Sequence, residues 1–339
     1  MRWLVMVIVL SAPAMARAQS AVTVRLSPEG DMLAQQLGVS AAELAAQIKG
    51  RVDDIYQTAS IDDFLEAFTD ATSFSARGIG ADYASVPRGL IAGLAANVSA
   101  AGDEDIRSKE RPTAGIAANF AVMVGINLRE WRHPRWTVYA NGFYRNAATE
   151  QLDGSVTSAG AHVQYQLLPP SAEAGAETFM RWIGVSLTTG LEYTRWKLGS
   201  DGDTLSTSFS VGSGSNTAPV ALDSVGRLDL TSTAVTVPLE ATTGIRVALI
   251  ATLYVGAGLD FTIGRSTIDS SLSGVMRSSD GRDLGTVDIT ATGSNNGSPG
   301  TARILAGVQL NLWKLKLFGQ VNASQAPAAS IAFGLKFVQ

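Results

Sequence analysis

The chain has no cysteine and only two histidines among its 339 residues. Without cysteine there can be no disulfide, no thiolate zinc site and no cysteine nucleophile, and two histidines argue against a histidine-rich metal centre. Charged residues are scarce, at 17% of the chain against about 25% in ordinary soluble domains. The net charge of −4 argues against nucleic acid as a partner. These absences are typical of a chain that folds in an unusual solvent.

The first 18 residues are expected to be an export signal. Arg2 precedes an apolar run at residues 3–10, and Ala16-Arg17-Ala18 has the small-residue pattern of a cleavage site. The apolar run is too short for a membrane-spanning helix, which needs about 20 residues. We therefore expect residues 1–18 to be a signal peptide, with residues 19–87 and 88–339 as the two parts of the exported chain.

Residues 40–71 have the period of two helices. Ser40 and Glu43 have the spacing of a capping box, and a second helix start follows at Ser60. Each helix carries an apolar stripe at three- and four-residue steps. The stripes are Leu44, Ile48, Val52 and Ile55 in the first helix, and Ile61, Phe64, Leu65 and Phe68 in the second. The remaining faces are acidic, so these helices need an apolar surface on one side only.

From about residue 88 the period changes to two residues. In residues 233–247 the odd-numbered positions are mostly apolar, whereas the even-numbered positions are mostly polar or small. Successive strand side chains face opposite sides of a sheet, so such a strand has one apolar face and one polar face. Ten strands are expected on this pattern: 88–99, 114–128, 136–148, 156–168, 180–197, 230–247, 252–265, 301–312, 315–323 and 329–338.

Four further segments have strand-like runs and leave an alternative open. They are 204–212, 220–228, 268–276 and 284–292. These segments either lengthen the structure above the membrane as hairpins or add a pair of strands, which gives twelve.

A transmembrane antiparallel up-and-down β-barrel fits these strands better than a soluble sandwich. The apolar faces are long enough for the roughly 9–11 residues that a tilted strand needs to cross a bilayer. Short turns such as 248–251 and 313–314 alternate with long loops such as 198–229 and 266–300, as in barrels with short periplasmic turns. Aromatic residues at strand ends fit two interfacial girdles. They are Trp131, Trp136, Trp182 and Trp313 beside the short turns and Trp196 at the other end of its strand.

Several charged residues fall on the polar faces and are therefore expected to line the lumen. They are Glu192, Glu240, Arg246, Asp260, Arg303, Lys316 and Lys336, joined by His162. A charge on the lipid side would be costly. Because a ten-stranded barrel is narrow, we expect these charges to pair across a filled interior rather than to line a wide path. Many inward positions are glycine, which leaves space that the N-terminal segment is able to occupy.

The last strand, residues 331–339, resembles the C-terminal assembly signal of bacterial outer-membrane β-barrel proteins. It alternates apolar residues up to a late aromatic, although Phe337 stands third from the end. The resemblance covers residues 88–339 at the level of the class. It implies residence in a Gram-negative outer membrane, with membrane lipid and the barrel-assembly machinery as partners. Residues 73–80 are also loosely similar to the segment that opens long-chain fatty-acid transporters.

The leading functional hypothesis is a non-enzymatic barrel that acts as a narrow, porin-like pore or carrier, or as a structural surface protein. Small solutes or an apolar ligand are its possible cargo, and a fatty-acid-like transporter with an N-terminal hatch is one alternative. A barrel-embedded hydrolase is another. His162 shares a strand face with Ser158, but four residues of strand separate them by roughly 13 Å, too far for a hydrogen bond. No catalytic residue, cofactor or metal site is expected.

The two helices are expected to form a cap or plug at the periplasmic end of the barrel. Seven acidic residues in 40–71 exclude the lipid-facing wall, and two short helices alone make a poor core. Lys316, Lys336, Arg132 and Arg135 lie near the periplasmic end in this topology. These basic residues are the expected partners of the acidic helix faces.

Overall fold

The computed structural model describes residues 19–56, 60–85, 87, 89–102, 113–149, 152–171, 179–248 and 250–339. The predicted signal peptide, residues 1–18, lies outside the described residues. Within the described part, none of the helices has the length and apolar character needed to cross a membrane.

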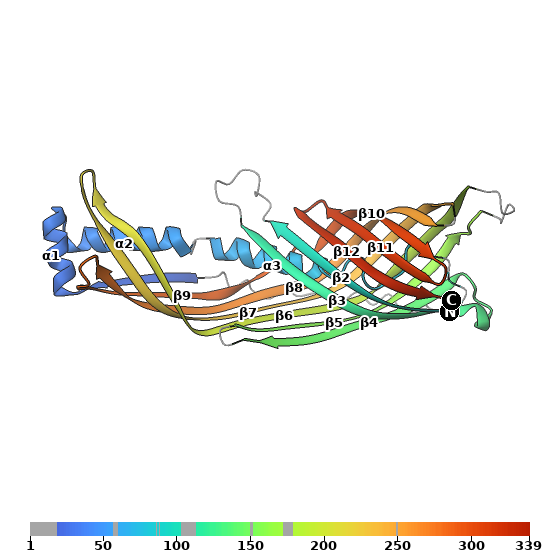
Figure 1. Ribbon diagram of the computed structural model, residues 1–339, viewed down its shortest axis with the longest axis horizontal. Coiled ribbons are helices and arrows are strands. Elements are labelled where there is room, and N and C mark those ends of the chain that lie inside the picture. Colours follow the sequence, from blue (N-terminus) through green and yellow to red (C-terminus); the bar gives the residue numbers. More distant parts are fainter. Residues whose placement is uncertain are drawn as a thin grey trace, which may run out of the picture.

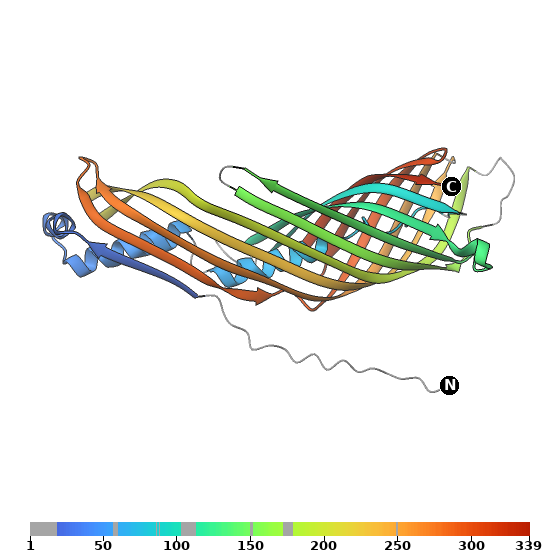
Figure 2. The same cartoon turned by 90° about the horizontal axis from the view of Figure 1, so that it is seen from below.

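A closed ring of ten antiparallel strands forms the body of the molecule (Figures 1 and 2). Its order is β2-β3-β4-β5-β6-β7-β8-β10-β11-β12, and β12 pairs again with β2. The strands are β2 (Leu90–Gly102), β3 (Ala114–Asn127), β4 (Trp136–Ala148), β5 (Leu152–Leu168), β6 (Met180–Ser213), β7 (Asn216–Val247), β8 (Ala251–Ser278), β10 (Gly300–Leu312), β11 (Leu315–Ser324) and β12 (Ala328–Val338). The predicted all-β barrel of ten strands is confirmed.

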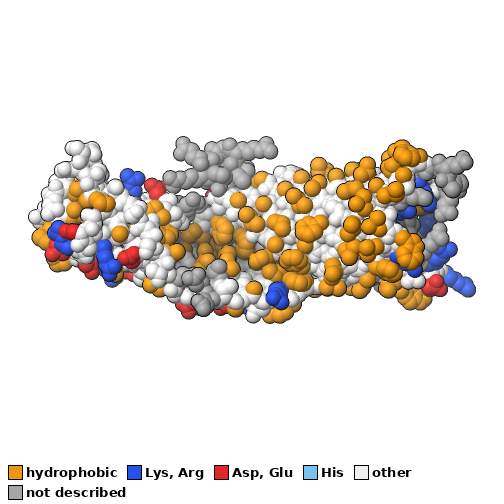
Figure 3. All heavy atoms as spheres, viewed as in Figure 1, with side chains coloured by type: hydrophobic (Ala, Val, Ile, Leu, Met, Phe, Trp, Pro, Cys, Tyr) orange, Lys and Arg blue, Asp and Glu red, His pale blue; other side chains and the backbone are white. Residues whose placement is uncertain are grey.

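The wall of the ring has an apolar outside and a polar inside. Leu239 and Leu259 are about half exposed on the outer face, whereas Glu240 and Asp260, their neighbours in sequence, are buried inside. Figure 3 shows the resulting band of hydrophobic side chains over the barrel. Alternation with a period of two therefore sets both the strand pairing and the side on which each residue lies.

Three ring strands continue far beyond one end of the ring. β6, β7 and β8 run on as long hairpins, and β9 (Asp283–Asn296) pairs with the projecting part of β8. β1 (Gln19–Leu26) then pairs with β9. The four strand-like segments left open by the sequence therefore form this projecting sheet and are not extra members of the ring. Residues 198–229 and 266–300, expected as loops, are mostly strand for the same reason.

Three helices precede the ring: α1 (Pro28–Leu37), α2 (Ala41–Tyr56) and α3 (Ile61–Phe74). α2 and α3 match the two predicted helices, whereas α1 and β1 were not anticipated. α1 and α2 pack on the inner face of the projecting sheet, and α3 points into the ring (Figures 1 and 2). We refer to β1, α1, α2 and the projecting parts of β6–β9 as the cap.

The expected position of the helices at the end with the short turns is wrong. The short turns after β3, β7 and β10 lie together with the C-terminus at one end of the ring, and the cap lies at the other (Figure 1). The reason is the apolar inner face of the projecting hairpins. Leu44, Ile48 and Val52 of α2 form one buried cluster with Leu222 and Met276 near the hairpin tips. The basic residues of the short-turn end cannot reach these helices.

Candidate functional site

The lumen of the ring is occupied by the chain itself. Residues 67–84, the second half of α3 and the irregular segment that follows, are all buried. We call these residues the plug. The chain enters from the cap, passes along the lumen and emerges at the short-turn end, where β2 begins at Leu90. The plug therefore joins the two ends of the barrel through its interior.

Glycines of both the wall and the plug let the two approach closely. A Cβ atom built on Gly115 of β3 would lie 2.4 Å from the backbone N and Cα of Phe68 in α3. A Cβ on Gly80 of the plug would lie 2.3 Å from Nε2 of His162 in β5. Any side chain at either position would displace backbone or a buried ring. Glycine at these contacts is thus a requirement of the packing.

Side chains of the wall hydrogen-bond to the plug backbone along its length. Asn97 Nδ2 donates to the Arg77 carbonyl at 2.5 Å, and Ser99 Oγ donates to the Ala71 carbonyl at 2.7 Å. Deeper in the lumen, Gln164 Nε2 donates to the Asp82 carbonyl at 3.0 Å. The irregular backbone of the plug needs these partners because buried peptide groups without them are costly.

An ion network links the plug to four strands of the wall. Arg77 Nη1 lies 2.7 Å from Glu192 Oε2 of β6, and Arg77 Nε lies 3.2 Å from Asp260 Oδ2 of β8. Arg303 of β10 contacts the same Asp260 oxygen at 2.9 Å and also pairs with Glu240 of β7. All five side chains are almost completely buried. We call Arg77, Glu192, Glu240, Asp260 and Arg303 the lumen ion network.

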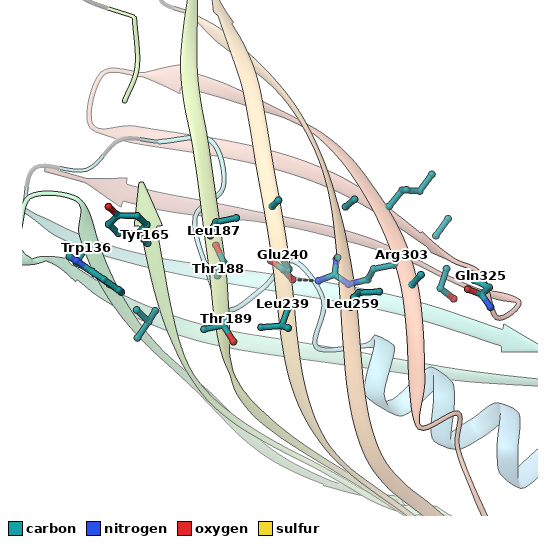
Figure 4. A pocket seen from close by; sticks show the side chains of 18 residues that line it. Trp136, Tyr165, Leu187, Thr188, Thr189, Leu239, Glu240, Leu259, Arg303 and Gln325 are labelled. Atoms are coloured by element: carbon teal, nitrogen blue, oxygen red, sulfur yellow. Dashed lines mark hydrogen bonds and ion pairs between the residues drawn. The ribbon is translucent and has the colours of Figure 1, made fainter. Parts of the chain in front are cut away.

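Gly258 leaves room on the inner face of β8 for an ion pair between residues of its two neighbouring strands. Glu240 and Arg303 both lie opposite Gly258, one on each neighbouring strand. A Cβ on Gly258 would lie 3.2 Å from Glu240 Cγ and 3.7 Å from the guanidinium carbon of Arg303. Figure 4 shows the two charged side chains meeting across the strand between them. The glycine expected on this inward face therefore has a specific function in the network.

A second plug contact lies nearer the short-turn end. Asp82 Oδ1 is 3.3 Å from Lys336 Nζ of β12, and both side chains are buried. The same ammonium group stands 4.0 Å from the centre of the Phe318 ring, a cation–π distance. Asp82 also accepts the backbone N–H groups of Ala84 and Ser85. The plug is thus fixed by opposite charges at two levels, Arg77 and Asp82.

His162 lies buried in the lumen, and among the described residues no nucleophile is hydrogen-bonded to its ring. Its Nε2 is 3.5 Å from Glu192 Oε1, and the ring is buried against the plug. Ser158 Oγ donates to the Phe120 carbonyl of β3. The arrangement is that of a packed lumen residue in an ion network.

The remaining predicted lumen residues lie nearer the rim. Arg246 is half-buried and its Nε contacts Thr252 Oγ1 at 3.5 Å, and Lys316 bonds the Trp313 carbonyl of the adjacent turn. Of the eight predicted residues, six lie buried around the plug and these two do not. Within the described residues, no group of three or more His, Asp or Glu side chains is arranged to hold a metal ion.

Four of the five predicted interfacial tryptophans lie exposed near the short turns: Trp131, Trp136, Trp182 and Trp313. Trp196 does not belong to that set. It is inward-facing and packs against the buried cluster of Leu65, Phe68 and Leu230 at the base of α3. The prediction that Trp196 lies in an interfacial girdle is therefore wrong. At this level of β6 the apolar side chains lie on the inner face of the sheet, where they pack against α3.

Sequence reasoning missed Arg77 and Asp82, the two plug residues that carry the ion pairs. The segment around them has no strand or helix period, which is typical of a connector between elements. A usable signal was present: single opposite charges stand within a run of glycine, alanine and serine. Such small residues permit close packing, and isolated charges among them require buried partners.

The outer wall also has a wide apolar concavity. Trp136, Tyr165, Leu187, Leu239 and Leu259 line it from the outside of the ring, as Figure 4 shows with the Glu240–Arg303 pair behind them. Its lining belongs mostly to the apolar band, and the charged residues Glu240 and Arg303 that border it pair with each other. Few polar groups therefore remain to fix a ligand's orientation.

The class-level resemblance of the sequence extends to solved structures. The translocator domain of autotransporter NalP from Neisseria meningitidis is 12% identical, with a TM-score of 0.32, and the match covers 80% of this chain and 93% of that one. The outer membrane protease OmpT from Escherichia coli is 8% identical, with a TM-score of 0.38 and coverage of 75% and 97%. The attachment invasion locus protein Ail of Yersinia pestis is 9% identical, with a TM-score of 0.25 and coverage of 73% and 95%.

With TM-scores below 0.5, these likenesses assign no activity or ligand to this chain. No curated protein matches it. A family model does match, over residues 17–339, which is nearly the whole chain and includes cap, plug and ring. The chain belongs to the Lsa36-like family.

Proposed function

We propose that this protein is a closed outer-membrane barrel that holds its cap on the cell surface. In this proposal it acts as a structural or surface-interaction protein, without enzymatic activity and without an open pore. The single observation that carries the proposal is the plug: residues 67–84 are buried in the lumen and joined to the wall by the lumen ion network.

Residence in a membrane is supported by the outer band. Exposed leucine, isoleucine, valine and phenylalanine side chains surround the ring, and a soluble protein rarely exposes a continuous apolar surface of this extent. Each ring strand pairs with a neighbour on both sides, with β3 and β4 paired over 122–127 and 137–142, so most backbone groups of the ring are bonded within the sheet and need no water. Outer membranes are where closed antiparallel barrels of this type are found.

The cap is assigned to the cell surface by the lengths of the connections. Outer-membrane barrels have short turns on the periplasmic side and long segments outside. Here the short turns and the C-terminus share one end, and the long hairpins with α1 and α2 form the other. Exposed charged pairs on the cap, such as Arg227 with Asp229 and Arg277 with Asp223, suit an aqueous surface.

The alternatives have less support. An apolar cargo would have to pass buried charged groups in the lumen, which oppose an apolar path. A hydrolase needs an accessible base and nucleophile, whereas His162 is buried beside Glu192 and Gly80. A porin-like channel needs an open lumen, and the plug occupies it.

Closure is tested by conductance in planar lipid bilayers. We expect the exported chain, residues 19–339, to give no stable channel steps. A variant that lacks residues 19–85 keeps all ten ring strands and should conduct. Equal, sustained conductance of both proteins would overturn the proposed closure.

Sidedness is tested separately with an epitope inserted at Gly50. This residue lies on the exposed face of α2, and its Cβ position is open. We expect antibody to bind intact cells that carry this insertion. An insertion at His133, in a short turn, should be reached only after the outer membrane is permeabilised. The reverse labelling pattern would place the cap in the periplasm and contradict the surface assignment.

A further inference from the structure

A half-open cavity lies where the cap meets the ring, away from the plug network. It has a volume of about 810 Å³ and sits where α2 ends and α3 begins, above the inner face of the projecting sheet. Figure 3 shows hydrophobic side chains in a hollow between the barrel and the far end of the cap. Small-molecule pockets have volumes of about 300–1,000 Å³, so the space has the size of a ligand site.

Two apolar walls face each other across this cavity. Ile55, Ile61 and Phe64 form the helical wall. The sheet supplies Leu205, Leu228, Ile268 and Leu272 from three adjacent strands. Most of these side chains are only partly buried, although the same faces are fully packed further along. Apolar walls left apart in water lose the stabilisation that contact or a ligand would provide.

The cavity has no charged side chain directed into it from the described residues that line it. Arg227 is among the lining residues, but on β7 it alternates with Gly226 and Leu228 and lies on the opposite face. Its side chain is 65% exposed and pairs with Asp229 at 2.9 Å. The polar groups that remain on the cavity side include the hydroxyl groups of Ser200 and Ser270. A charged ligand group would therefore be buried without a counter-ion, which is costly.

Gly226 keeps the floor of the cavity open. The same face of β7 carries Leu222, Leu228 and Leu230, which are large apolar residues. A Cβ at Gly226 would meet only ordinary contacts, 3.5 Å from the Ser271 carbonyl oxygen and 3.6 Å from a Leu272 methyl. The backbone would tolerate a side chain here, so glycine is not required by the sheet. Its effect is to leave volume between the two walls.

The geometry points to a binding site for an uncharged apolar small molecule in the cap. The ligand lies between the helix junction and the sheet, and the hydroxyl groups at the margin are able to bond one neutral polar end. This inference goes beyond the proposed surface function and does not depend on it. The cavity has the same shape whether the cap faces the cell exterior or the periplasm.

The test measures binding of N-phenyl-1-naphthylamine, an uncharged fluorescent probe, to the protein in lipid nanodiscs. Protein-free nanodiscs provide the lipid background. We expect saturable fluorescence above this background. Gly226→Phe should fill the floor of the cavity and weaken binding at least tenfold, while its melting temperature stays equal to that of the parent or rises.

Gly199→Phe is the matched control. Gly199 lies opposite Asp229 on the outer face of the same sheet, and its Cβ position meets nothing closer than 3.6 Å. It adds the same ring outside the cavity and should leave probe binding unchanged. Ser270→Phe, which fills the cavity from β8, should repeat the loss. Unchanged affinity in both filling variants would overturn the inference, as would equal losses in the control.

Charge selectivity gives an independent result. The anionic analogue 8-anilino-1-naphthalenesulfonate has a similar aromatic body, but its sulfonate has no partner in the cavity. We expect it to bind at least tenfold more weakly than the neutral probe, with no further loss in Gly226→Phe. An anionic probe that binds as tightly, and is displaced by the same substitution, would contradict the uncharged class of ligand.

Discussion

The plug and the cap helices α1 and α2 belong to one N-terminal segment, yet they are held by opposite kinds of contact. In the lumen, Arg77 and Asp82 pair with charges of the wall, and polar side chains bond the plug backbone. In the cap, Leu44 and Ile48 are buried among aliphatic residues of the hairpins. The difference follows from the strands that surround each part, because their inner faces change chemistry along their length.

β7 shows this change within a single strand. In the cap, Leu222 and Leu230 point inward and are buried, whereas Asp229 on the other face is exposed. In the ring, Glu240 points inward, and Leu239 is exposed on the outside. The apolar face thus passes from the inner side to the outer side near residues 231–232. This exchange marks the level at which water outside the sheet gives way to lipid in the proposed membrane setting, and it decides how each part of the N-terminal segment must be held.

The largest expected effect is at Arg77. Arg77→Met keeps the length of the side chain but leaves Glu192 and Asp260 without their plug partner, and removing one member of a buried pair costs about 3–5 kcal/mol. We expect a lower melting temperature and the onset of conductance in bilayers. Arg227→Met, which removes an exposed pair of the cap, should change little. A stable, non-conducting Arg77→Met protein would show that charge pairing does not hold the plug.

The cap should respond to loss of apolar contact instead. Leu44 is completely buried in the cap cluster, so Leu44→Ala should cost about 2–5 kcal/mol. Hydrogen exchange should rise in α1 and α2, while the ring and plug stay protected. Met32→Ala, on an exposed position of α1, is the control and should have little effect. Loss of protection in the plug as well would mean that cap and plug unfold as one unit.

The change of faces along β7 is tested by two arginine substitutions on the same outward side. Leu239→Arg lies in the apolar band, where a charge facing lipid should cost about 2–4 kcal/mol. Val225→Arg lies in the cap, where that side faces water, and should be nearly neutral. The two side chains are 45% and 53% exposed, so exposure alone predicts equal effects. Equal unfolding free energies of the two variants in lipid vesicles would refute the assigned boundary.

The smallest expected effect is at the start of α2. Ser40 and Glu43 form a reciprocal cap, in which the Ser40 backbone N–H donates to Glu43 Oε2 at 2.8 Å and the Glu43 N–H donates to Ser40 Oγ at 3.2 Å. Ser40→Ala should cost about 1 kcal/mol. Amide exchange at the start of α2 is the measurement, and unchanged exchange would show that the cap motif contributes nothing there.

The pH dependence of this contact has a defined sign. The Ser40 backbone N–H, followed by its hydroxyl group, lowers the pKa of Glu43 below the ordinary value of 4.5. A lowered acid pKa gives a contribution that is present above the unfolded pKa and is lost as pH falls through the folded pKa. Exchange at the start of α2 should therefore rise below about pH 4.5 in the parent but not in Glu43→Gln. An identical pH profile in both proteins would contradict the contact.

Much of the ring was predictable from sequence because each ring strand repeats one simple alternation. The expected strand 136–148 coincides with β4, and 315–323 differs from β11 by one residue. The inward positions of Glu192, Glu240 and Asp260 followed from the same parity. The ion-pair partners of these residues could not be predicted in the same way. The pairing depends on Arg77, which lies in a segment without any strand or helix period.

The position of the helices was wrong for a related reason. The acidic faces of residues 40–71 suggested charge pairing with basic residues at the short-turn end. The helices are instead anchored through their apolar stripes. The apolar surface that these stripes contact comes from alternate residues of 220–228 and 268–276. These segments form hairpins and not loops, and their apolar residues face α2. The start and end of α1 also had recognisable signals, Ser27-Pro28 and Gly38, whereas no local pattern shows that β1 pairs with β9.

The path of the chain through its own ring has a consequence for the order of folding. The ring closes when β2 pairs with β12, its first strand with its last, so the closing contacts join residues from opposite ends of the barrel sequence. Contacts of such long sequence separation form slowly. Residues 19–56 must already lie beyond the far mouth when this seam forms, because β1, α1 and α2 are bound there to β9 and the projecting hairpins. Because β2 and β12 pair late, the N-terminal segment has time to cross the lumen while it is still extended. Pairing of β2 with β12 then encloses this segment within the ring.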